Sequence, residues 1–177
     1  VLINGGTGTL NLGAAITLAG GRSVDVQNRT AGTVTFSGPI TDASGTGTGI
    51  LLSANTGSTI AFTGGMALST GPNHAFTATG GGTVTATQNN TTIVNTLTTV
   101  EGVALRVEDT EIGSAGLIFR SISAGSNVNS PGIGIILNNT GTAGPNGGLT
   151  VTGNGTMESG GKIWRKDGPD GSLTAGV

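Results

Sequence analysis

The chain has 177 residues, of which 35 are glycine, 5 are proline and none is cysteine, and its formal net charge is −2. Charged residues make up 9% and aromatic residues 3%, which argues against a charged disordered tail and against a helical bundle. The lack of cysteine excludes disulfides and thiol catalysis. Seven lysines and arginines are too few for a nucleic-acid-binding surface, and no apolar run is long enough for a membrane span. We expect a single domain over residues 1–177 that is part of a longer repeat protein.

A repeat runs through the first half of the chain. Four segments begin with threonine, alternate apolar with polar or small residues, and recur at offsets of 24, 26 and 24 residues: Thr9–Leu12, Thr33–Phe36, Thr59–Phe62 and Thr83–Ala86. Two further strand-like pieces, bounded by Gly, Asn, Ser or Pro, follow within each period. In the fourth period the first of these is Ile93–Val94. A fixed period of this length, with three short strands in each, predicts a β-solenoid.

Stacking explains how such short strands would hold together. One coil of the chain cannot bury its apolar residues, but stacked coils place each inward side chain on its equivalent one period along. Successive coils would also pair in parallel through their backbones. We expect two core columns on the repeated segment: Leu10, Val34, Ile60 and Val84, and Leu12, Phe36, Phe62 and Ala86.

The second half of the chain follows the pattern less regularly. Its strand-like pieces are Thr110–Ile112, Leu117–Ile122, Ile133–Leu137, Leu149–Thr152, Ile163–Arg165 and Leu173–Thr174. The step lengthens to about 39 residues, and the excess falls in two polar stretches, Ser123–Pro131 and Asn138–Gly148. We expect both stretches to be loops that leave the stack.

Several runs in this half carry a family resemblance: Asp109–Ser123, Gly134–Gly141, Gly147–Gly153 and Gly160–Ile163. They resemble the right-handed parallel β-helix repeats of large bacterial secreted and cell-surface proteins, which include adhesin-like and autotransporter-passenger-like proteins. The resemblance implies an all-β, right-handed parallel β-helix of about six turns with three short strands each. It also implies an extracellular, cell-surface location and a structural or adhesive role without enzymatic activity. The run Trp164–Asp167 departs from the polar, uncharged residues usual in such repeats.

Five residues are candidates for a surface that binds a ligand or partner. On an extended strand Lys162, Trp164 and Lys166 share one face, where an aromatic ring flanked by cations could stack on a sugar or dock a partner. Arg106 and Glu108 are two positions apart and would share the outer face of another strand. The expected partner is a surface glycan or the surface of a host or neighbouring cell.

Two other functions remain open. The Arg106 and Glu108 pair could belong to a module that binds or cleaves a polysaccharide, because acidic and basic groups together support proton transfer. Outward threonine columns at positions such as Thr33, Thr59 and Thr83 resemble the face of an ice-binding β-solenoid. The single histidine, His74, is interpreted as a corner or core residue.

The sequence predicts no cofactor and no catalytic or metal-binding residue. Asp167 and Asp170 could help to hold calcium, although the composition of Asp167–Gly171 is typical of a turn. The open ends of a β-helix expose unpaired backbone, so end-to-end association into a filament is a further expectation.

Overall fold

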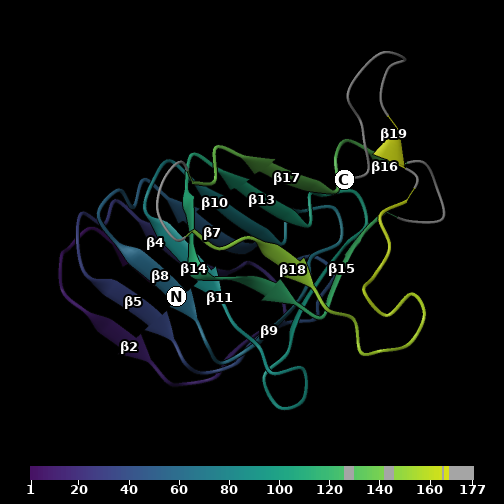
Figure 1. The fold of residues 1–177 in the computed structure, drawn as a ribbon, viewed down its shortest axis with the longest axis horizontal. Helices are drawn as coiled ribbons and strands as arrows, with labels where there is room; N and C mark the ends of the chain where they lie inside the picture. Colours follow the sequence, from purple (N-terminus) through teal and green to yellow (C-terminus); the bar gives the residue numbers. More distant parts are fainter. Residues whose placement is uncertain (126–129, 142–145, 165, 168–177) are drawn as a thin grey trace.

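The strands form three parallel sheets that wind around one apolar core (Figure 1). This computed structural model describes residues 1–125, 130–141, 146–164 and 166–167. Within these residues the secondary structure is β-strand without any helix. Every pair of neighbouring strands is parallel, and successive strands along the chain belong to different sheets. The chain is therefore an all-β parallel β-helix, as the repeat and the resemblance predict.

Each sheet collects one strand from each coil of the chain, which we call a turn. Sheet A contains β1 (Leu2–Asn4), β4 (Arg22–Gln27), β7 (Gly49–Ser53), β10 (Phe76–Thr79), β13 (Leu105–Glu108) and β17 (Ile135–Asn138). Sheet B contains β2 (Leu10–Leu12), β5 (Thr33–Phe36), β8 (Thr59–Phe62), β11 (Thr83–Ala86), β14 (Glu111–Phe119) and β18 (Leu149–Val151). Sheet C contains β3 (Ile16–Leu18), β6 (Ile40–Asp42), β9 (Met66–Ser69), β12 (Asn95–Thr99) and β15 (Ser121–Ala124). A separate pair joins β16 (Ser130–Pro131) and β19 (Lys166–Asp167).

The described residues make five complete turns and part of a sixth. In the sixth turn β17 and β18 are present, and the third strand is reduced to a single bridge between Ala124 and Ile163. The expected strand Ile163–Arg165 is thus one bridged residue as far as the structure describes it, and Leu173–Thr174 lies outside the described residues. The expected strand Ile93–Val94 is wrong, because the strand of that turn is Asn95–Thr99.

The strand register aligns the residues that the repeat period predicts to form core columns. Val34 aligns with Ile60 and Ile60 with Val84, while Phe36 aligns with Phe62 and Phe62 with Ala86. All six side chains are at most 1% exposed. The rings of Phe36 and Phe62 are stacked, with centroids 5.0 Å apart and planes 8° from parallel. Equivalent residues of neighbouring turns therefore lie directly over one another.

An edge-to-face aromatic contact links sheets A and B across the core. Phe76 of β10 lies 5.5 Å from Phe62 and 6.4 Å from Phe119, with interplanar angles of 72° and 78°. Offset and edge-to-face geometries are the favourable ones for aromatic pairs. Four phenylalanines from four consecutive turns therefore form one continuous cluster in the centre of the stack.

A conformational repeat marks the corner that follows sheet A. The residue directly after each of the six strands has a positive φ, between +48° and +75°: Gly5, Asn28, Ala54, Gly80, Asp109 and Asn139. Glycine, asparagine and aspartate tolerate this left-handed conformation best. Side-chain hydrogen bonds also join neighbouring turns at this corner. The Asn28 amide donates to Asn4 Oδ1, and the Asn139 amide donates to Asp109 Oδ1.

A bulge interrupts sheet B in the fifth turn. Val84 pairs with Ile112 and Ala86 with Leu117, so five positions on β14 match two on β11. These three extra residues lengthen the step between the two strands from 28 residues at Val84 and Ile112 to 31 at Ala86 and Leu117. From β14 to β18, Leu117 aligns with Leu149 at a step of 32 residues. The 39-residue step holds only between Ala124 and Ile163. The expected strands Thr110–Ile112 and Leu117–Ile122 are therefore mainly one bulged strand, β14.

A loop between β11 and β12 reaches across two later turns. The Gln88 amide donates to the Thr152 hydroxyl at 2.9 Å, and the Asn90 amide donates to the carbonyl of Gly153 at 2.6 Å. Arg120 of the fifth turn donates to both the side chain and the backbone oxygen of Asn90, each at 2.7 Å. We call residues 87–94 the clamp loop, because it joins the fourth, fifth and sixth turns.

Candidate functional site

The outer face of sheet A presents two files of side chains that run along the stack. One file contains Leu2, Asp25, Leu51, Thr77, Arg106 and Ile136, which are aligned by the strand register. The second contains Asn4, Gln27, Ser53, Thr79, Glu108 and Asn138. Regular parallel pairing fixes these side chains on one rigid surface, which suits a repeated or extended ligand.

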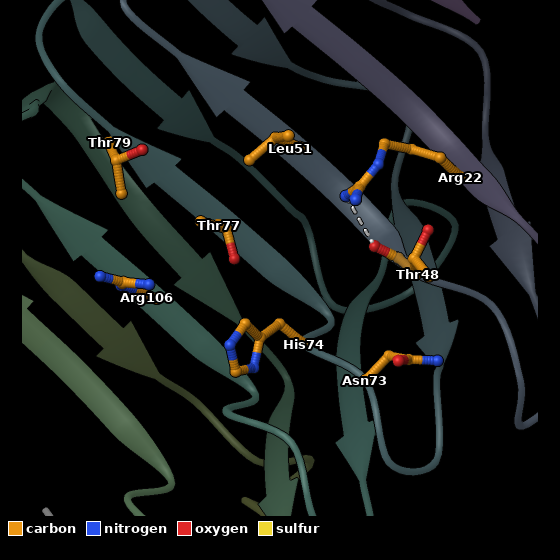
Figure 2. Close-up of a pocket in the computed structure, with 8 residues that line it drawn as sticks. All are labelled: Arg22, Thr48, Leu51, Asn73, His74, Thr77, Thr79 and Arg106. Carbon is orange, nitrogen blue, oxygen red and sulfur yellow. Dashed lines mark hydrogen bonds between the residues drawn. The ribbon is translucent and has the colours of Figure 1, made fainter.

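A groove of about 400 Å³ lies on this face. It is lined by Arg22, Thr48, Leu51, Asn73, His74, Thr77, Thr79 and Arg106. Figure 2 shows Arg22 and Arg106 on opposite sides of the groove, with Leu51, Thr77 and His74 between them. The lining therefore combines hydrogen-bonding side chains and one apolar side chain with an arginine at each side.

Neighbouring carboxylates orient both arginines. The Nε atom of Arg106 donates to Glu108 Oε2, as expected for two residues that share an outer face. Arg22 donates from Nη1 to the carbonyl of Thr48 at 2.9 Å, and its Nε lies 3.8 Å from Asp25 Oδ2. The side chains of Arg106 and Glu108 are 39% and 23% exposed. Exposed pairs of this kind stabilise a fold weakly, so their orienting effect matters more here than their energy.

Two adjacent corner residues, Asn73 and His74, line the groove. The backbone N–H of Val103 donates to His74 Nδ1 at 2.9 Å, which joins the fourth turn to the fifth. The Asn73 amide donates to the carbonyls of Thr46 and Gly47, at 3.2 and 3.1 Å, and joins the fourth turn to the third. His74 is therefore an exposed corner residue, one of the two placements that the sequence suggests.

The five candidate residues do not form one surface. Arg106 and Glu108 lie on sheet A, whereas Lys162 and Trp164 flank the bridge from Ile163 to the end of sheet C. Trp164 is 39% exposed, and its backbone N–H donates to the carbonyl of Ala124. Lys162 forms an ion pair with Glu158 at 2.9 Å. Lys166 lies in β19, opposite Ser130.

Sequence reasoning missed most of the groove. Arg22 and the adjacent corner residues Asn73 and His74 come from two different stretches of chain, and no spacing in the sequence joins them to Arg106. The register of sheet A could have suggested part of it, because Leu51, Thr77 and Arg106 are equivalent positions in successive turns.

The threonine columns of sheet B are regular in part. Thr33, Thr59 and Thr83 align across three turns, but Glu111 follows them. In the neighbouring column Ala61 separates Thr35 from Thr85. The bulge of β14 then adds a second hollow of about 340 Å³ between the threonines and Asn146. The flat threonine array is therefore limited to the second to fourth turns.

The described residues contain no cluster of three or more His, Asp, Glu or Cys side chains that could hold a metal ion. They also contain no helix of the length and apolarity that a membrane crossing needs. Of the two aspartates suggested for calcium, Asp167 pairs with Pro131 in the short strand pair, and Asp170 lies outside the described residues.

No protein-family model, curated protein or solved structure matches the chain. The parallel β-helix architecture and its grooved outer face therefore carry the functional argument.

Proposed function

We propose that the chain is a structural and adhesive β-helix segment of a secreted bacterial cell-surface protein, and that it binds glycans at the groove on sheet A. The groove is the observation that carries this proposal. Its lining of arginine, asparagine, histidine and threonine offers hydrogen bonds to sugar hydroxyls, while Leu51 offers an apolar surface to a ring. The family resemblance supports the cell-surface setting.

The rigidity of the stack supports the adhesive role. Arg22, Leu51, Thr77, Thr79 and Arg106 lie on β4, β7, β10 and β13, which are held by parallel backbone pairing. The other lining residues lie in the corners before β7 and β10. A preformed site loses little conformational entropy on binding, so modest contacts suffice for recognition. Repeated weak sites along a longer β-helix would add through multivalency.

A glycan array tests the proposal directly. The purified chain, immobilised at high density, is expected to retain a subset of bacterial or host surface glycans. Arg106→Gln is expected to lose that binding, while Thr35→Ala on sheet B retains it. Binding that disappears with Trp164→Ala but survives Arg106→Gln would move the site to the end of sheet C. Absence of binding to every glycan would contradict the proposal.

Polysaccharide cleavage is the second candidate, since Arg106 and Glu108 are held together beside the groove. A lyase or hydrolase would release new chain ends from a bound polysaccharide. The adhesive proposal expects no such release after prolonged incubation. Chain shortening that is abolished by Glu108→Gln would favour the enzyme instead.

A further inference from the structure

The groove on sheet A has a one-sided charge distribution. Its lining contains two guanidinium groups, and no carboxylate belongs to it. Glu108 accepts a hydrogen bond from Nε of Arg106, and Oδ2 of Asp25 lies 3.8 Å from Nε of Arg22. Both terminal nitrogens of Arg106 therefore remain for an occupant of the groove, as does Nη2 of Arg22, whose Nη1 donates to the carbonyl of Thr48.

The terminal nitrogens of Arg106 are available for a ligand. Its Nε is bound by Glu108, and no described residue accepts a hydrogen bond from Nη1 or Nη2. Two parallel N–H groups on such a planar fork match the two oxygens of a carboxylate or the oxygens of a sulfate. An anionic group is therefore the partner that this arginine is oriented to receive.

The spacing of the arginines requires an extended ligand. Arg22 lies on β4 and Arg106 on β13, three strand spacings apart, which corresponds to about 14 Å along the stack. Leu51 and Thr77 occupy the strands between them. A single small anion cannot reach both arginines, whereas a chain with anionic groups at intervals can.

The middle of the groove favours sugar over nucleic acid. Threonine and asparagine side chains suit hydroxyl groups, and no Phe, Tyr or Trp side chain lines the groove to stack on a base. The chain as a whole has a net charge of −2, which repels a dense polyanion. An acidic polysaccharide combines sparse charge with many hydroxyls.

From this arrangement we propose that the groove binds a linear acidic polysaccharide along the axis of the stack, with its carboxylate or sulfate groups on Arg22 and Arg106. The inference rests on the proposed glycan binding at the same groove and names the class of glycan.

Titration calorimetry of the whole chain with four probes tests it: an oligogalacturonate, a sparsely sulfated carrageenan oligosaccharide, a neutral cello-oligosaccharide and a single-stranded oligonucleotide. We expect at least one acidic oligosaccharide to bind about tenfold or more tightly than the neutral one. Arg106→Gln and Arg22→Gln are each expected to lower that affinity about tenfold. Comparison of the affinities for the oligogalacturonate and the sulfated oligosaccharide shows whether the groove prefers carboxylate or sulfate groups.

A charge-matched control separates the groove from net charge. The double variant Arg106→Gln with Thr35→Arg keeps the net charge but moves the cation to sheet B, so we expect the affinity to stay low. Restored affinity in this variant would overturn the inference. Equal binding of acidic and neutral oligosaccharides would also overturn it while leaving the proposed function intact. Equal or tighter oligonucleotide binding would overturn it in favour of a general polyanion site. Absence of binding to all three oligosaccharides would overturn the inference, and the glycan array then decides whether the proposed function also fails.

Discussion

At the scale of single residues, the fold depends on a few backbone conformations and ring contacts that recur from turn to turn. The corner after sheet A is the clearest case, because six successive turns place one residue there with positive φ. Five of the six positions hold glycine, asparagine or aspartate, which accept this conformation, and the exception is Ala54 at φ 55°.

Replacing Ala54 by glycine is therefore expected to stabilise the protein. A left-handed conformation costs an alanine about 1 kcal/mol relative to glycine, so the free energy of unfolding should rise by about that amount. Urea denaturation measures it. The matched control is Gly80→Ala in the next turn, where φ is +75° and the same change is expected with opposite sign. A stability loss on Ala54→Gly would contradict this explanation of the corner.

The aromatic cluster predicts a large effect at Phe62. This ring contacts both Phe36 and Phe76, so Phe62→Ala should lower the free energy of unfolding by about 3–5 kcal/mol. Thr35→Ala is the control, because it points outward and Ala61 already occupies the equivalent position one turn later. We expect that change to lie within about 0.5 kcal/mol. If chemical denaturation showed similar losses of unfolding free energy for Phe62→Ala and Thr35→Ala, the column that contains Phe62 would not be the stabilising core.

At the scale of strands and loops, the sequence predicts the regular parts and misses the irregular ones. The alternation in Thr33–Phe36 and Thr59–Phe62 fixes which face is buried, because a half-buried strand has a period of two. The bulge in β14 cannot be read in the same way, since Gly113–Gly116 looks like a turn between two strands. The groove is harder to predict than the strands, because only the folded stack brings Arg22 and Asn73 to the same groove as Arg106.

The bulge gives a prediction about register. Deleting Ser114–Gly116 removes the three extra residues and leaves Leu117 next to Ala86, so the protein should fold with a continuous sheet B. Deleting Gly113–Gly116 removes one more residue and would turn Leu117 to the outer face. Circular dichroism and hydrogen exchange distinguish the two outcomes. Equal stability of both deletions would mean that register in the fifth turn is not set by burial.

At the scale of the whole molecule, the first and the last turn of the described residues both expose apolar side chains. Leu10 in the first turn faces the core column yet is 38% exposed, and Leu137 and Val151 in the sixth turn are 43% and 41% exposed. The strands β1, β2 and β3 are terminal in their sheets within the described residues. Such edges are templates for pairing with another chain.

We therefore predict end-to-end association that grows with concentration. Sedimentation velocity should show species larger than the 177-residue monomer at high concentration. Leu10→Lys places a charge on the exposed end and should shift the distribution to monomer, whereas Thr41→Lys on the outer face of sheet C should not. A monomer at every concentration, or equal effects of the two lysines, would contradict head-to-tail stacking.

The clamp loop changes how this solenoid is expected to come apart. In an ideal repeat stack each coil interacts only with its immediate neighbours, so the terminal coil can peel away alone. Here Gln88 and Asn90 tether the fourth coil to Thr152 and Gly153, two coils further on. Unfolding of the sixth turn must first break the hydrogen bonds of the clamp loop, which belongs to the fourth turn. The last three turns should therefore unfold together in one cooperative transition.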